Sequence, residues 1–116
     1  MSSQRRATFG GTVRELRTRK QISLRKFAER IGISATYLSK IEREEFKPPS
    51  RDKIKEIADA LGQDYDEMLA LADKTAPDLE QAILSHPKQI AAFLRIAKRL
   101  GPDDIDALTA QAKKKQ

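Results

Sequence analysis

The chain has 116 residues and a formal net charge of +6, a length that allows one domain with a short extension but not two large domains. It contains no cysteine and a single histidine, His86, so a disulfide framework is excluded and we expect no metal and no cofactor. No apolar run approaches the roughly 20 residues of a membrane span, and the first residues lack the apolar segment of a secretory leader, which predicts a cytoplasmic protein without membrane contact.

Positive charge is concentrated in the N-terminal half of the chain. Residues 1–60 hold 15 Lys and Arg against 8 Asp and Glu, whereas residues 61–116 hold 8 against 9. A basic surface attracts polyanions, although charge that serves only solubility is the alternative explanation. A polyanionic partner is therefore expected to contact the N-terminal half.

Helix signals begin after a short polar segment. Residues 1–8 are basic and aperiodic, and we expect a flexible arm in which Arg5 and Arg6 are loose candidates for phosphate contacts. From Phe9 to about Lys20, apolar residues recur at spacings of three and four, which predicts the first helix.

Four more helices are expected before residue 75. Each apolar stripe follows a polar residue that is suited to capping a helix N-terminus: Ser23, Ser34, Ser50 and Asp64. Gly32 and Gly62 end two of these helices, and the Lys47-Pro48-Pro49 segment ends the third helix of the chain because proline lacks an amide donor.

The chain changes character at Ala76-Pro77. Weaker apolar patterns, separated by proline and glycine, predict three further helices over residues 78–85, 88–100 and 102–113. No segment alternates with the period of a strand. The predicted fold is therefore all-α, with a five-helix domain over residues 9–75 and a helical extension over residues 76–116.

The most informative pattern is a pair of short helices joined by a tight turn at Gly32-Ile33. Two helices that cross closely need a small residue at the crossing, which Ala28 supplies, and glycine permits the sharp turn. Four polar residues then share the exposed side of the third helix: Thr36, Ser39, Lys40 and Arg43. This pattern predicts a helix-turn-helix whose second helix can enter a groove of DNA.

Residues 9–73 resemble the five-helix DNA-binding domain of the Xre family, the Cro/CI-type phage and bacterial repressors. The resemblance rests on two stretches, FGGTVRELRTRKQISLRKFAERIGISATYLSKIE and PPSRDKIKEIADALG. It implies a sequence-specific transcriptional regulator that binds double-stranded DNA and is not an enzyme. In that family the N-terminal half of the third helix lies in the major groove and reads base edges.

Carried onto this sequence, the resemblance implies base contacts from four residues of the third helix: Ala35, Thr36, Ser39 and Lys40. Lys40 suits guanine O6 or N7, and Thr36 or Ala35 suits a thymine methyl group. Phosphate contacts, which fix register without reading sequence, are expected from six others: Arg25, Lys26, Ser34, Tyr37, Arg43 and Lys47. Tyr37 could instead pack its ring against the second helix, and the two roles are compatible.

Arg17 and Glu42 allow two interpretations, a charged contact surface for DNA or a buried ion pair. The resemblance implies the ion pair, which would tie the first helix to the third.

The sequence differs from many members of the Xre family at two places, and each difference leads to a separate expectation. Leu24 stands where many relatives have glutamine, so a polar contact to DNA is expected to be missing. The run Glu42-Arg43-Glu44-Glu45-Phe46 lacks the glycine that many relatives have after the Glu-Arg pair. We therefore expect a longer third helix, followed by a loop whose Glu44 and Glu45 repel phosphates.

The C-terminal extension carries apolar stripes that are too extensive to lie bare in water: Ile90, Phe93, Ala97, Leu100, Ile105 and Leu108. They could fold back on the fifth helix, or they could form the interface of a two-fold homodimer. We favour the homodimer because a single helix-turn-helix makes few contacts with DNA. The same helices are also candidates for binding another protein.

These patterns together predict a repressor that binds an inverted-repeat operator as a homodimer and blocks polymerase by occupancy. The alternative is an antitoxin that binds a toxin through its C-terminal helices and regulates its own operon. An enzyme or small-molecule sensor is disfavoured because no Ser-His-Asp order, glycine-rich phosphate loop or metal-ligand spacing is present. His86 is interpreted as a helix cap or an exposed loop residue.

Overall fold

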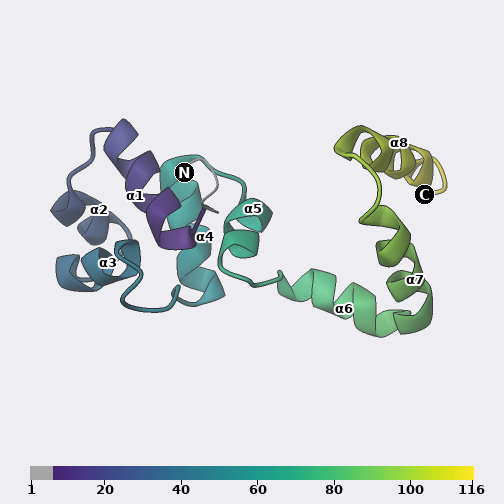
Figure 1. Ribbon diagram of the computed structural model, residues 1–116, viewed down its shortest axis with the longest axis horizontal. Helices are drawn as coiled ribbons and strands as arrows, with labels where there is room; N and C mark the ends of the chain where they lie inside the picture. The colour runs from purple at the N-terminus through teal and green to yellow at the C-terminus, as the bar shows by residue number, and fades with distance from the viewer. Residues whose placement is uncertain (1–6) are drawn as a thin grey trace. The chain divides into compact units, whose positions relative to one another are not determined.

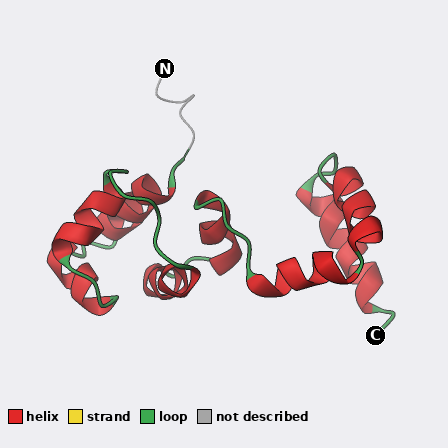
Figure 2. Ribbon diagram, turned by 90° about the horizontal axis from the view of Figure 1, so that it is seen from below, coloured by secondary structure: helices red, strands yellow, loops and turns green. Residues whose placement is uncertain are grey.

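The computed structural model describes residues 7–116, and these form helices joined by loops without a strand, as Figure 2 shows. The predicted all-α fold is confirmed. Residues 1–6, with Arg5, Arg6 and most of the expected arm, lie outside the described residues. Figure 1 shows the helices in chain order: α1 (Phe9–Arg19), α2 (Leu24–Arg30), α3 (Ala35–Glu42), α4 (Arg51–Leu61), α5 (Tyr65–Leu71), α6 (Pro77–Ser85), α7 (Pro87–Ala97) and α8 (Pro102–Lys113).

The chain divides into two compact units, Met1–Ala76 and Pro77–Gln116. The first unit contains α1 to α5, and the second contains α6 to α8. Each unit is described by itself below.

Side-chain caps set the helix starts in the first unit. Ser34 Oγ accepts a hydrogen bond from the Tyr37 amide at 3.0 Å, and Asp64 accepts one from the Glu67 amide at 3.0 Å. Ser23 and Ser50 cap α2 and α4 in the same way. Each cap satisfies an amide that has no partner within its own helix, which is why these polar residues predicted the starts.

The core of the first unit is formed by apolar side chains from all five helices. In this core α1 packs on α3 and α4, α2 packs on α3, and α4 packs on α5. Its largest fully buried side chains are Phe9, Val13, Phe27, Ile31, Leu38, Ile41, Ile54, Ile57, Leu61, Met68 and Leu69. Leu38 and Ile41 belong to α3, so one face of α3 is held in the core while its other face is free to make contacts.

The expected extension of α3 is wrong, because α3 ends at Glu42. Glu44 adopts a left-handed backbone with φ of 65°, and the amides of Glu45 and Phe46 both donate to the Lys40 carbonyl. A non-glycine residue in this conformation is strained by about 1 to 2 kcal/mol. The Glu44 carboxylate accepts the Gly11 amide at 3.3 Å, a contact with α1 that offsets part of this strain.

The second unit has almost no core of its own. Only Ala97 among its residues is buried, whereas eight of its large apolar side chains are exposed: Leu79, Ile83, Leu84, Phe93, Leu94, Ile96, Ile105 and Leu108. Segments of about 40 residues rarely fold stably without further support.

Among residues 7–116, none of the helices has the length and apolar character required to cross a membrane.

Candidate nucleic-acid interface

The junction between α2 and α3 is a tight, glycine-dependent turn. Gly32 has φ of 72°, a conformation that L side chains rarely adopt, and the Ile33 amide donates to the Ala28 carbonyl at 3.0 Å. Ala28 is buried, so α2 lies close to the elements around it. Figure 1 shows α2 and α3 next to each other, and they pack directly. This geometry is that of a helix-turn-helix.

The four residues expected to contact bases lie along α3. Thr36 is exposed, and Ala35, Ser39 and Lys40 are half-buried. None of them belongs to the group of fully buried residues that fills the first unit. Their side chains therefore have surface available for a ligand that lies against α3.

The residues expected to contact phosphates surround this face. Tyr37 is half-buried and the other five are exposed: Arg25, Lys26, Ser34, Arg43 and Lys47. Arg25 and Lys26 lie in the first turn of α2, whose capping hydroxyl on Ser23 already accepts the Lys26 amide at 3.1 Å. A phosphate here would meet the two side chains rather than that amide.

Arg43 has an ion-pair partner in the free protein. Its guanidinium lies 2.8 Å from the Glu45 carboxylate, and both side chains are about half exposed, at 52% and 48%. An exposed pair of this kind contributes little to stability, so a phosphate can replace Glu45 at low cost. The expectation that Glu44 and Glu45 repel phosphates stays a prediction.

Arg17 and Glu42 form a buried ion pair with two parallel hydrogen bonds. The Arg17 Nε and Nη2 atoms donate to the Glu42 carboxylate at 2.8 and 2.9 Å, and Nη1 donates to the Ile22 carbonyl at 2.8 Å. The hydrogen bond to Glu42 raises the pKa of Arg17, and desolvation opposes this shift. Arg17 on α1 is thus joined both to Glu42 on α3 and to the loop that precedes α2. This is the buried ion pair that the resemblance implied.

A hollow of about 190 Å³ lies beside this ion pair in the first unit. Its lining residues are Arg14, Arg17, Leu24, Ser39, Glu42 and Arg43. The lining holds three guanidinium groups and one carboxylate, that of Glu42, so it carries a net positive charge, part of which Glu45 offsets through its ion pair with Arg43. Such a site is suited to a phosphate group.

Arg14 is the residue of this hollow that the sequence reasoning missed. It lies three positions before Arg17 on α1, a spacing that places two side chains on one face of a helix. That spacing was the available signal, but only the packing of α1 against α3 brings Arg14 near Ser39 and Arg43. Leu24, at the position where the resemblance implies glutamine in many relatives, supplies an apolar wall.

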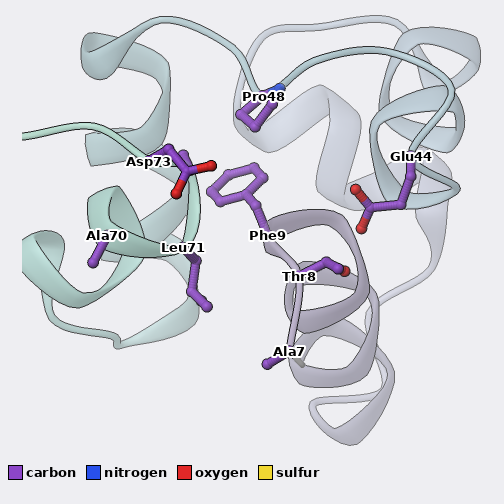
Figure 3. A pocket seen from close by; sticks show the side chains of 9 residues that line it. Ala7, Thr8, Phe9, Glu44, Pro48, Ala70, Leu71 and Asp73 are labelled. Atoms are coloured by element: carbon purple, nitrogen blue, oxygen red, sulfur yellow. The ribbon is translucent and has the colours of Figure 1, made fainter. Parts of the chain in front are cut away.

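A larger cavity of about 560 Å³ in the first unit has the opposite character. Figure 3 shows the Phe9 ring beside Pro48 and Asp73, with Glu44 on the opposite side of the cavity. Its lining contains two carboxylates and no lysine or arginine: Ala7, Thr8, Phe9, Glu44, Pro48, Ala70, Leu71, Ala72 and Asp73. A polyphosphate would be repelled from this cavity, so it is not part of the candidate interface.

The candidate dimer residues are placed unevenly in the second unit. Phe93, Ile105 and Leu108 are exposed, Ile90 and Leu100 are half-buried, and Ala97 is buried. Phe93 and Leu108 also line an apolar hollow of about 420 Å³ between α7 and α8.

The sequence reasoning missed Leu94 and Ile96, which are exposed on α7 outside the expected stripe. With them, α7 is apolar on most of its circumference, a pattern typical of a helix that is covered on several sides.

No group of three or more metal-ligating side chains is found among residues 7–116. His86 is the N-cap residue of α7 and makes no side-chain capping hydrogen bond.

A family model described as a helix-turn-helix domain matches residues 10–74, more than half of the chain. The chain belongs to this helix-turn-helix family. The matched residues include the whole of the α2–turn–α3 unit and the Arg17–Glu42 pair.

Relatives and solved structures agree with this membership. An uncharacterized HTH-type transcriptional regulator of Mycobacterium tuberculosis, found in two strains, is 42% identical over 52 residues, which are 45% of this chain and 36% of the relative. The match thus spans about a third of the relative's length. The crystal structure of SinR, a master regulator for biofilm formation, in complex with DNA is 29% identical with a TM-score of 0.50, covering 53% of this chain and 98% of that chain.

A SinR–SinI complex is similar over 78% of this chain and 95% of that chain, with a TM-score of 0.50. At 24% identity this likeness shows the fold alone. The resemblance to the Xre family is confirmed by the family match and the relatives. The relatives are named as transcriptional regulators, which is not an enzyme class, and this agrees with the prediction for the chain.

Proposed function

We propose that this helix-turn-helix protein binds double-stranded DNA by placing α3 in the major groove and thereby regulates transcription. The observation that supports this most is the asymmetry of α3: Leu38 and Ile41 are buried in the core, whereas Thr36 is exposed and Ser39 borders a hollow lined by arginine. A rigid helix with a polar outer face fits the width of the major groove.

The two sets of contacts have different roles in this proposal. Base edges are read by Thr36, Ser39 and Lys40, whose side chains keep exposed surface on α3, and by Ala35, which is half-buried and also packs against the core. The six residues expected to contact phosphates fix the register of the protein on the duplex, and Arg14 joins them from α1.

The protein acts as a homodimer that represses transcription from an inverted-repeat operator. The second unit supports this, because its large apolar side chains are exposed in the single chain and a second copy would bury them. Two copies related by a two-fold axis match two half-sites about 34 to 36 Å apart, one turn of DNA. Occupancy of such a site excludes polymerase.

Gel-shift series on two variants test the division of roles. Lys40→Ala should relax base preference, because it removes a contact to a base edge, whereas Arg25→Ala should weaken binding to all sequences by a similar factor. If Arg25→Ala changes base preference and Lys40→Ala weakens all duplexes uniformly, the assignment of roles is wrong.

The exposed apolar side chains of the second unit also support a second candidate, an antitoxin that holds a toxin through α6 to α8. The two candidates differ in the state of the purified chain. A regulator that needs no other protein forms a homodimer alone, whereas the antitoxin candidate predicts that a toxin copurifies and that the chain without it remains a monomer.

A further inference from the structure

We infer that Phe46 positions Lys40 for base reading, so that a residue outside the helix-turn-helix contributes to the sequence preference of the protein. The inference rests on the proposed function, because it concerns how one of the proposed base contacts is oriented. It adds a residue that neither the helical pattern nor the family match assigns to DNA recognition.

The first observation is the position of the ring. The Lys40 ammonium lies 5.1 Å from the centroid of the Phe46 ring, within the distance of a cation–π interaction. The Tyr37 and Phe46 ring centroids are 5.9 Å apart and the rings are tilted by 50°, a favourable aromatic geometry. Phe46 therefore contacts two side chains that lie one turn apart on α3.

The second observation is that the backbone directs the ring to this place. The left-handed conformation of Glu44 turns the chain back toward α3, and the Phe46 amide then donates to the Lys40 carbonyl at 3.2 Å. The loop is thus tied to the same residue whose side chain the ring contacts. Phe46 is 47% exposed, so its ring remains accessible beside the Lys40 ammonium.

A lysine on its own is poorly suited to selective base contacts. Its ammonium ends a flexible four-carbon chain and binds a phosphate as readily as a base. The Phe46 ring favours positions of this ammonium on one side of α3, which directs Lys40 toward base edges more than toward phosphates on either strand. Restricting the side chain before binding also reduces the entropy lost when the contact forms.

The test measures base preference at one position. The probe is the duplex that the wild-type chain enriches from a random pool, compared with duplexes that carry each other base pair at the position where Lys40→Ala loses its preference. In Phe46→Leu the preference at that position should fall about fivefold, at the lower end of what one base contact discriminates. The salt dependence of binding should stay the same, since no phosphate contact is lost. Phe46→Tyr, which keeps an aromatic ring, should retain the preference.

Tyr65→Leu is the matched control variant. The Lys55 ammonium lies 5.5 Å from the Tyr65 ring centroid, so this change removes a cation–π contact of the same kind from α4 and α5. It should leave base preference unchanged. Thermal unfolding of each variant identifies conditions in which all of them are folded before binding is measured.

A double-mutant cycle separates positioning from direct contact. In a Lys40→Ala background, Phe46→Leu should have no further effect on the affinity for the enriched duplex, because its action passes through Lys40. A further loss in that background shows that the ring itself contacts DNA and overturns the inference, as does an equal loss of affinity for every duplex. If the wild-type chain enriches no sequence from the pool, the proposed function fails instead.

Discussion

At the scale of single residues, the Arg17–Glu42 pair determines how α3 is presented. The two side chains are only 12% and 4% exposed, and the Arg17 guanidinium also holds the Ile22 carbonyl. Burying two charges is costly, and their hydrogen bonds offset that cost only while both partners are present. The pair therefore fixes α1 and α3 relative to each other.

Removal of one partner should be more harmful than removal of both. Arg17→Met should lower the free energy of unfolding by about 3 to 5 kcal/mol, because it leaves the Glu42 carboxylate buried without a partner. The double variant Arg17→Met with Glu42→Leu should be more stable than Arg17→Met alone. Urea unfolding followed by circular dichroism measures both, and a single variant that loses less than the double variant contradicts this account.

Arg14 provides a test of the hollow beside α3. Arg14→Ala should weaken binding to all duplexes and reduce the slope of log affinity against log salt concentration by about 0.9, the value for one phosphate contact. Arg19→Ala is the control, because Arg19 lies on the same helix, is paired with Glu15 at 2.6 Å and does not line the hollow. Equal slopes for wild type and Arg14→Ala, measured by fluorescence anisotropy, would show that no phosphate is bound there.

Sequence reasoning reached some of these residues and not others. Arg17 and Glu42 were suggested by the resemblance, and the structure places them in contact. Arg14 and Phe46 were not, because their neighbours lie on other elements. Arg14 borders Ser39 only through the packing of α1 on α3, and Phe46 reaches Lys40 only because the chain reverses at Glu44.

At the scale of helices, capping residues and prolines allowed the helix starts to be predicted from the sequence. The end of α3 could not be predicted in this way. Ser34 and Asp64 predict the starts of α3 and α5, because a short polar side chain before an apolar stripe accepts hydrogen bonds from backbone amides in the first turn of a helix. The end of α3 depends on a left-handed Glu44, a conformation that its side chain does not favour. The Glu44 carboxylate accepts a hydrogen bond from the Gly11 amide on α1, which is 33 positions away, so the sequence around Glu44 could not predict this contact.

The close approach of α1 to α3 depends on Gly10. A Cβ atom at this position would overlap the Ile41 carbonyl oxygen, which is backbone and cannot move aside cheaply. Gly10→Ala should therefore lower the free energy of unfolding by about 1 to 3 kcal/mol, as overpacking does. Gly101→Ala is the matched control, since no atom lies within 4 Å of an added Cβ there, and it should cost less than about 1 kcal/mol. Equal losses for the two variants in thermal unfolding would contradict the close packing of α1 and α3.

At the scale of the whole molecule, the two units differ in how complete they are. Residues 7–76 form a core of their own, whereas residues from Pro77 onward leave large apolar side chains exposed. The change at Ala76-Pro77 was visible in the sequence as weaker periodicity. The sequence could not show what covers the apolar side chains of the second unit, because a stripe of apolar residues has the same pattern whether it packs against its own chain or against a second copy.

Sedimentation equilibrium tests the proposed role of the second unit. The full chain should be a dimer, and Leu108→Lys in the full chain should shift it toward monomer, because the change buries a charge in the proposed interface. The fragment 1–76, which keeps the first unit's core, should remain monomeric. Dimerisation of this fragment as tight as that of the full chain would place the interface elsewhere.

The central claim is that the outer face of α3 reads DNA sequence. It is tested most directly by sequencing the duplexes that the full chain retains from a random pool, in parallel with a variant that carries Ser39→Ala and Lys40→Ala. The account predicts a two-fold symmetric consensus for the wild type, with half-sites about one helical turn apart, and loss of enrichment at one symmetric pair of positions in the variant. The same consensus from both proteins, or no consensus from the wild type, would contradict it.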